Sequence, residues 1–228
     1  MTEKDARRDR IKRSIMRTIT NPGERSEQRS IGPSEIAKEC DYCVGRALTR
    51  KYPELWWEAT TFSESHSHKA WIGTAIHEKL ERDHDEGLKE AKLFIAHLEG
   101  YGDIYGHSDL YQDSTAIDYK TKDLSAIDKI RLHGPPPSEV FQIFLYGHGQ
   151  LLAGRSVEDV ALVYIPRDSN DSEEVEVVFA EYNPEVARKA LERLERIWTT
   201  VRVGEGSTLE RGDDCYVCKR SRPSKRWW

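Results

Sequence analysis

Two carboxylates and a lysine with a suggestive spacing stand near the middle of this 228-residue chain. Asp109 is followed nine residues later by Asp118-Tyr119-Lys120. Residues two apart on a strand point to one face, so Asp118 and Lys120 share a side, and a neighbouring hairpin strand can bring Asp109 beside them. Two hard oxygen ligands and a cation can form a centre for Mg²⁺- or Mn²⁺-assisted phosphodiester cleavage, with Lys120 orienting the attacking water. The alternative is the ordinary polarity of a half-exposed hairpin.

Two helical segments on either side of this pattern offer further polar groups. In Gly73-Thr74-Ala75-Ile76-His77, the glycine lies one turn before His77 and permits close packing, so the imidazole can reach the strand ends as a metal ligand. Gln142 and Tyr146 lie one turn apart on one helix face and could contact a nucleic-acid strand by hydrogen bonding and stacking. Taken singly, His77 is equally an ordinary core or surface histidine, one of eight, and the Gln–Tyr pair carries no specific meaning.

All four cysteines of the chain occur in two Cys-x-x-Cys pairs near its opposite ends, Cys40 with Cys43 and Cys215 with Cys218. The chain shows no secretory signal, so disulfides are not expected, and the pairing indicates a metal site if the fold brings the ends together. Four thiolates suit either structural Zn²⁺ or an iron–sulfur cluster, and the spacing does not separate the two. Such a site would clamp the two ends of the chain, a structural role.

The elements that must position these residues follow from hydrophobic periodicity and turn residues. Helices are expected over 3–18, 33–50, 67–98 with a break near 87, 139–153 after a proline tract at 135–137, and 184–203. Strands are expected over 93–99, 103–112, 114–122, 157–167 and 173–182. This order predicts an α/β protein, a mixed sheet of about five strands flanked by helices. Cys40 and Cys43 should share one face of the 33–50 helix.

Composition narrows the class of protein. Hydrophobic residues make up 37% of the chain and charged residues 33%, and the mean hydropathy is −0.73. No stretch approaches the length of apolar residues that a membrane span needs, so we expect a soluble, cytoplasmic protein with no membrane partner. The length suits one domain. No phosphate-binding loop of the P-loop NTPase kind occurs, so any motor that works with this chain is another protein.

Charge is distributed unevenly along the chain. Residues 1–30 and residues 211–228 each hold four more basic than acidic residues, and because the whole chain carries −5, the middle carries −13. Such a chain could bind a polyanion at its ends while central carboxylates hold divalent cations; a merely solvated surface is the alternative. The last residues combine five cations with Trp227 and Trp228, which suits either phosphate and base contacts or a partner-binding tail.

In combination and in this order, the motifs resemble those of the RecB-type nucleases of the PD-(D/E)xK superfamily. The family pattern runs G-x-x-x-H, G-x-x-D, D/E-x-K and Q-x-x-x-Y. It is matched in turn by Gly73 with His77, Gly106 with Asp109, Asp118 with Lys120, and Gln142 with Tyr146. The resemblance covers about residues 31–220 and implies a restriction-endonuclease-like fold there, with a polar basic extension over 1–30 and a basic aromatic tail over 221–228.

The resemblance implies a metal-dependent DNA exonuclease. Mg²⁺ or Mn²⁺ would be bound by His77, Asp109, Asp118 and the backbone carbonyl of Tyr119, with Lys120 as the catalytic lysine. The implied partners are DNA, single-stranded or with free ends, and a helicase or recombination protein. The implied setting is recombination, repair, or phage or CRISPR DNA processing, in a bacterial cell or phage-infected host. The alternatives are an inactive DNA-binding or adaptor protein with a four-cysteine zinc site, and an endonuclease or an RNA or hybrid nuclease of the same fold.

The cysteines are similar to those of stand-alone RecB-like nucleases, including the CRISPR-associated adaptation nucleases and phage relatives, which hold an iron–sulfur cluster. This similarity implies a cluster, 4Fe-4S in type, on Cys40, Cys43, Cys215 and Cys218, with zinc as the alternative. Those nucleases have one cysteine before the core and three after it, whereas this chain has two and two. The departure leaves the ligand set and the cluster type open.

Overall fold

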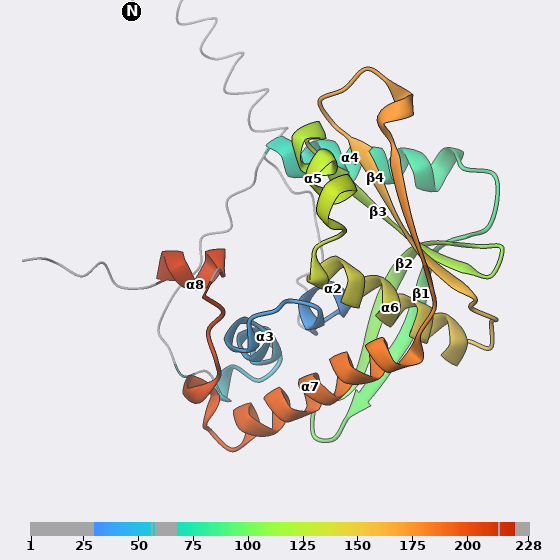
Figure 1. Cartoon of the computed structure of the whole chain (residues 1–228). Helices are drawn as coiled ribbons and strands as arrows, with labels where there is room; N and C mark the ends of the chain where they lie inside the picture. The colour runs from blue at the N-terminus through green and yellow to red at the C-terminus, as the bar shows by residue number, and fades with distance from the viewer. Residues whose placement is uncertain (1–29, 56, 58–67, 214, 222–228) are drawn as a thin grey trace, which may run out of the picture.

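The computed structural model describes residues 30–55, 57, 68–213 and 215–221 (Figure 1). The strands are β1 (Leu88–Leu98), β2 (Gly102–Gln112), β3 (Thr115–Lys122), β4 (Asp159–Pro166) and β5 (Glu176–Glu181). The helices are α2 (Pro33–Ile36), α3 (Asp41–Leu48), α4 (His68–Asp83), α5 (Leu124–His133), α6 (Pro137–Leu152), α7 (Pro184–Arg202) and α8 (Tyr216–Ser221). Short 3-10 turns are η1 (Pro53–Leu55), η2 (Ser172–Glu174) and η3 (Gly206–Thr208). The helix predicted over 3–18 and the two terminal tryptophans lie outside the described residues.

The strands form one mixed sheet in the order β1-β2-β3-β4-β5. The meander β1-β2-β3 is antiparallel, β4 and β5 are antiparallel, and β3 and β4 run parallel. A parallel neighbour needs a crossover connection, and α5 and α6 supply it between β3 and β4. The prediction of an α/β protein with a five-stranded mixed sheet flanked by helices is therefore confirmed.

β2 and β3 separate soon after the turn that joins them. The turn residues Asp113 and Ser114 both have positive φ, 49° and 57°, as a tight two-residue hairpin turn requires. The paired register extends only from Gln112 opposite Thr115 to Leu110 opposite Ile117, whereas β3 stays in register with β4 along its whole length. The next residues along the two strands are Asp109 and Asp118, so the predicted carboxylates stand at the fork where the strands diverge.

The core lies between the sheet and the helices α6 and α7. α6 contacts β1, β2, β3 and β4, and α7 packs against α6 (Figure 1). The buried residues of α7 recur at helical spacing and give it one apolar face: Ala187, Ala190, Leu194, Ile197, Trp198 and Val201. Within the described residues, no helix has both the length and the apolar character needed to cross a bilayer.

The helix predicted over 33–50 is interrupted. α2 ends at Ile36 and α3 starts at Asp41, because Cys40 adopts an extended conformation (φ −88°, ψ 107°) at the N-cap of α3. The prediction that Cys40 and Cys43 share a face of one continuous helix is wrong. The cause is tertiary: the Cys40 sulfur contacts Cys218 and accepts a hydrogen bond from the Gly212 amide, both far along the chain.

Two other predicted boundaries are wrong for similar reasons. The helix expected over 67–98 ends at Asp83, and Gly87, with φ +78°, leads into β1 five residues before the expected start of that strand. Residues 88–92 have helix-favouring types, but pairing with β2 determines their conformation. The proline tract was expected to exclude regular structure, yet α6 begins at Pro137, since proline fits the first position of a helix.

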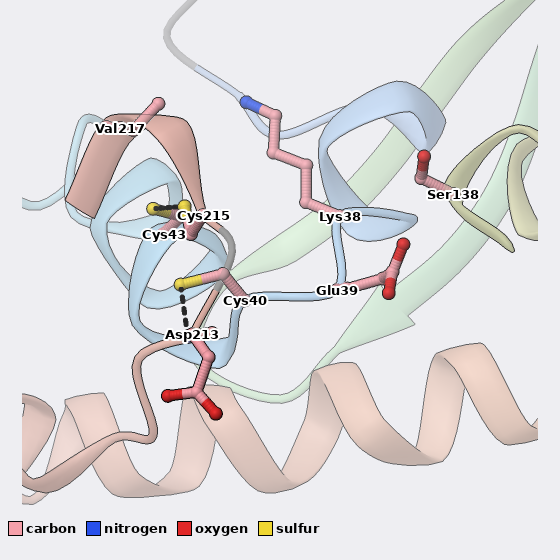
Figure 2. A pocket seen from close by; sticks show the side chains of 9 residues that line it. Lys38, Glu39, Cys40, Cys43, Ser138, Asp213, Cys215 and Val217 are labelled. Carbon is pink, nitrogen blue, oxygen red and sulfur yellow. Dashed lines mark hydrogen bonds between the residues drawn. The ribbon is translucent and has the colours of Figure 1, made fainter. Parts of the chain in front are cut away.

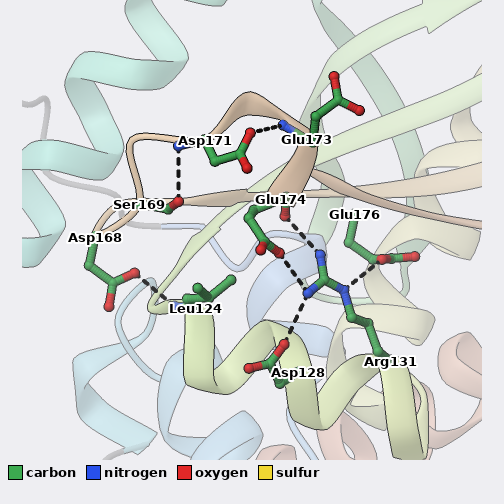
Figure 3. A network of polar contacts seen from close by, with 9 residues as sticks. All are labelled: Leu124, Asp128, Arg131, Asp168, Ser169, Asp171, Glu173, Glu174 and Glu176. Atoms are coloured by element: carbon green, nitrogen blue, oxygen red, sulfur yellow. Dashed lines mark hydrogen bonds and ion pairs between the residues drawn. The ribbon is translucent and has the colours of Figure 1, made fainter.

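Helix α5 was not predicted from the sequence. Figure 3 shows how side chains connect it to the loop and strand that follow β4. Arg131 donates to the carboxylates of Glu174 and Glu176 at 2.9 Å, and the Leu124 amide donates to Asp168 at 2.7 Å. These partners lie more than forty residues away, so no local pattern shows that they fix the helix.

Candidate active site and cysteine site

The Asp109 carboxylate replaces a backbone partner at the fork between β2 and β3. Because the strands separate there, the Tyr119 amide is not paired with the β2 backbone, and it donates instead to the side chain of Asp109, at Oδ2, at 2.7 Å. Asp118 lies one residue before that amide and is only 2% exposed. The sequence predicted that a hairpin would bring the two carboxylates to one place, and the described structure does so.

Asp118, Lys120, Gln142 and Tyr146 form one hydrogen-bonded network. Lys120 Nζ lies 2.5 Å from Asp118 Oδ2 and donates to Gln142 Oε1 at 3.1 Å. The amide nitrogen of Gln142 donates to Asp118 Oδ1 at 3.3 Å and to the Tyr146 hydroxyl at 3.2 Å. Gln142 and Tyr146 are both buried on α6, and Gln142 forms hydrogen bonds with both members of the Asp118–Lys120 ion pair on β3. Their predicted contact with DNA stays a prediction.

His77 reaches the site from α4 on the other side of β3. Its Nδ1 lies 3.7 Å from Asp109 Oδ1, and its ring meets the Tyr119 ring edge-on at 5.9 Å. One turn earlier, a Cβ at Gly73 would stand 2.7 Å from Thr121 Oγ1. The glycine therefore allows α4 to approach β3 closely enough for the imidazole to meet Asp109.

Burial and neighbouring charges shift the titration of this site. Burial raises the pKa of Asp118; the Lys120 ammonium opposes that shift, and the charge of Asp109 adds to it. The contact with the Asp109 carboxylate raises the pKa of His77, and burial opposes this effect. Keeping Asp118 ionised is thus costly, and the neighbouring Lys120 ammonium offsets part of that cost.

Glu90 is a third carboxylate near the fork that the sequence analysis missed. It stands on β1 between Lys89 and Ala91, whose register partners on β2, Leu110 and Ser108, flank Asp109. Its φ of 46° is a left-handed conformation unusual for a non-glycine residue in a strand. Burial raises the pKa of Glu90, and the charge of Asp109 adds to the shift. Only the register of β1 against β2 identifies this residue, so no local motif could have found it.

The donors at the fork fit a hard divalent cation in kind. The carboxylate oxygens suit Mg²⁺ or Mn²⁺, whereas the imidazole is a ligand more typical of transition metals. The potential ligand atoms at the fork lie further apart than the four cysteine sulfurs. Within the described part of the chain, the four cysteines are the one group of three or more potential ligands whose donor atoms all lie within 4.8 Å of one another.

The four cysteines converge from both ends of the described chain, and Figure 2 shows three of them, Cys40, Cys43 and Cys215. Cys40 Sγ lies 3.5 Å from Cys218 Sγ, and Cys43 Sγ lies 3.5 Å from both Cys215 Sγ and Cys218 Sγ. All four are free thiols, and Cys215 is the one that is not fully buried. The prediction that the fold brings the two Cys-x-x-Cys pairs together is confirmed.

Backbone and ionic contacts hold the cysteine segments side by side. The Tyr42 amide donates to the Glu210 carbonyl at 3.0 Å, and the Gly212 amide donates to Cys40 Sγ at 3.4 Å. Arg193 on α7 pairs with Asp41 at 2.6 Å and steadies the start of α3. A cavity of about 470 Å³ opens beside the thiols, lined by Lys38, Glu39, Cys40, Cys43, Ser138, Gly212, Asp213, Cys215 and Val217.

A mixed sheet with a carboxylate pair and a lysine at a strand fork is the arrangement expected from the resemblance to the PD-(D/E)xK nucleases. No family model matches this chain, and no curated protein sequence matches it. Among solved structures, an alkaline exonuclease (LHK-Exo) from Laribacter hongkongensis is similar with a TM-score of 0.54 at 8% identity, covering 78% of this chain and 90% of that one. LHK-Exo in complex with dAMP gives 0.52 at 11% identity with the same coverage. SSO0001 gives 0.51 at 16% identity, covering 85% and 86%.

At these identities the likeness is one of fold. It extends over most of this chain and most of each neighbour, so it is not confined to a shared fragment. The fold expected from the four sequence motifs is therefore confirmed as a fold that this chain shares with an alkaline exonuclease.

Proposed function

We propose that this chain is a metal-dependent DNA exonuclease that hydrolyses phosphodiester bonds. The observation that carries the proposal is the ion pair between the buried Asp118 and the partly buried Lys120, beside Asp109 at the strand fork. An ionised carboxylate in a buried position is costly, and such perturbed groups cluster at functional sites. The fold neighbours named as exonucleases, one of them solved with dAMP, support DNA as the substrate and cutting from an end.

The chain's own residues divide the work of hydrolysis. His77, Asp109, Asp118 and the Tyr119 carbonyl would hold the divalent ion, which supplies Lewis-acid polarisation of the scissile phosphate. Lys120 orients the attacking water and offsets negative charge that develops on the phosphate.

Gln142 and Tyr146 are placed in this proposal as positioning residues. Gln142 contacts both Lys120 and Asp118 through the two ends of its amide, and Tyr146 fixes the amide through its hydroxyl. Together they hold the ammonium and the carboxylate at a set separation before DNA arrives.

The test is cleavage of linear DNA, single- and double-stranded, labelled at the 5′ or the 3′ end, with Mn²⁺ present. Wild-type protein should shorten the strands stepwise, whereas Lys120→Ala and Asp118→Ala should leave them intact. Lys122→Ala is the matched control, because Lys122 lies two residues further along β3 and pairs with Glu139 at 2.6 Å. Activity near the wild-type level in Lys120→Ala would refute the assignment.

The same gels separate the alternatives of substrate and mode. Cutting of closed circular DNA would identify an endonuclease, and cutting of RNA or a hybrid would change the substrate. Binding of DNA without cleavage of any substrate would favour an inactive DNA-binding or adaptor protein. The pathway and a helicase partner stay predictions.

A further inference from the structure

The spacing of the four thiols does not fit the iron–sulfur cluster that the family resemblance implies. Three Sγ–Sγ distances are 3.5 Å, and all four sulfurs lie within 4.8 Å of one another. Four sulfurs bonded at about 2.3 Å to one tetrahedral ion lie about 3.8 Å apart. The observed group has the size of a site for one ion.

A cluster with several irons needs a wider arrangement. In a four-iron cluster each thiolate binds a different iron at an outer corner, which places the sulfurs roughly 6 Å apart. In a two-iron cluster the thiolates divide into two pairs, and sulfurs on different irons are similarly far apart. Any such division of these four cysteines separates at least two sulfurs that lie 3.5 Å apart here.

The neighbouring cavity does not supply the missing room. It borders Cys40, Cys43 and Cys215, but Cys218 does not line it, so the four thiols do not surround it. Its other walls include the charged side chains of Lys38, Glu39 and Asp213. The cavity is therefore a polar recess on one side of the thiols.

We propose that Cys40, Cys43, Cys215 and Cys218 bind a single Zn²⁺ ion as a closed structural site. Zinc takes four thiolates in a tetrahedral arrangement and needs no open position when its role is structural. Three of the thiols are buried, and the Gly212 amide donates to Cys40 Sγ, the kind of outer contact that orients a metal ligand. The ion would tie the start of α3 to α8. This inference does not depend on the proposed nuclease activity.

The test is the metal content of the full-length protein, purified anaerobically from cells supplied with both iron and zinc. We expect about one zinc per chain by mass spectrometry of metals, no acid-labile sulfide and no cluster absorption in the visible range. Replacing zinc with Co²⁺ should give the intense visible bands of a tetrahedral tetrathiolate, which added Zn²⁺ then removes. Two or four irons per chain with matching labile sulfide would overturn the proposal, as would one iron without sulfide.

Two variants separate this site from the fork. Cys43→Ser should lose most of the bound zinc, and Asp118→Asn should keep it while losing DNA cleavage. Because loss of a structural ion can unfold the end of the chain, the Co²⁺ spectrum of the wild-type protein is the primary readout. A wild-type protein that cleaves DNA but holds an iron–sulfur cluster would refute the zinc site alone.

Discussion

Gly73 offers a test of how the helix α4 places His77. A Cβ at this position would lie 2.7 Å from Thr121 Oγ1 and 3.9 Å from Thr121 Cβ. The first distance is too short for a carbon–oxygen contact, so Gly73→Ala must displace either the helix or the threonine. His77 follows one turn later on the same helix face, and a displaced helix carries the imidazole away from Asp109.

The expected magnitude is the balance of two opposing effects. Alanine in place of glycine inside a helix normally stabilises a protein by about 1 kcal/mol. Forcing an added carbon into a packed contact costs about 1–3 kcal/mol. We therefore expect Gly73→Ala to lower the free energy of unfolding by up to about 2 kcal/mol. A misplacement of His77 by about 1 Å should slow DNA cleavage by up to roughly a hundredfold.

A substitution at Thr121, the residue that a Cβ at Gly73 would meet, supplies the control. Thr121→Ala removes the clashing oxygen and leaves the Cβ at 3.9 Å, an ordinary contact. The double variant should thus regain both stability and activity, which urea unfolding and the initial rate of end-labelled DNA cleavage with Mn²⁺ would measure for all four proteins. If Gly73→Ala is as stable and active as wild type, or if the double variant is no better than Gly73→Ala, the steric reasoning is wrong.

Three further predictions concern the surroundings of the fork and the core. Gln142→Leu removes hydrogen bonds to Asp118 and Lys120, so it should cost about 1–3 kcal/mol of stability. Cleavage kinetics of this variant should show a lower kcat with little change in KM, whereas a raised KM alone would mark Gln142 as a DNA contact. Glu90→Gln should raise the Mn²⁺ concentration for half-maximal cleavage about tenfold, and an unchanged Mn²⁺ titration would exclude a role near the ion. Burial lowers the pKa of His148 below its ordinary 6.5. A hydrogen bond with the backbone of Ile95 acts in the opposite direction and raises the pKa, but burial has the larger effect. The unfolded chain then takes up the proton first, so stability falls as pH drops below about 6.5, and His148→Gln should flatten that loss in unfolding curves between about pH 7 and 5.

The elements with strong local signals could be predicted from the sequence. α7 has apolar residues at helical spacing, a proline at its first position and a glycine after its end, and its predicted bounds differ by one residue. Apolar and polar residues alternate along β2 and β3, and a two-residue turn joins the strands. The sequence alone therefore predicted that Asp109 and Asp118 lie on adjacent strands. The convergence of the four cysteines could also be predicted, because two Cys-x-x-Cys units in one chain are typical of a metal site.

The features that the sequence did not reveal depend on partners distant in the chain. The extended conformation at Cys40 is fixed by contacts with Gly212 and Cys218, and α5 is held by Arg131 contacts across more than forty residues. Glu90 is placed by strand register alone, in a segment whose residue types favour a helix. Local propensity is a weak guide wherever tertiary pairing opposes it.

The fork also explains why the candidate site can exist within an otherwise regular sheet. Continuing the β2–β3 ladder would pair the backbones of Asp109 and Asp118 and leave no room for an ion between the strands. Ending the ladder leaves the Tyr119 amide without a strand partner, a cost that the Asp109 carboxylate removes at 2.7 Å. Asp109 therefore stabilises the backbone at the fork, whereas the burial of Asp118 makes its ionised form costly. The two carboxylates of the motif are alike in type, but the fold gives them opposite relations to stability.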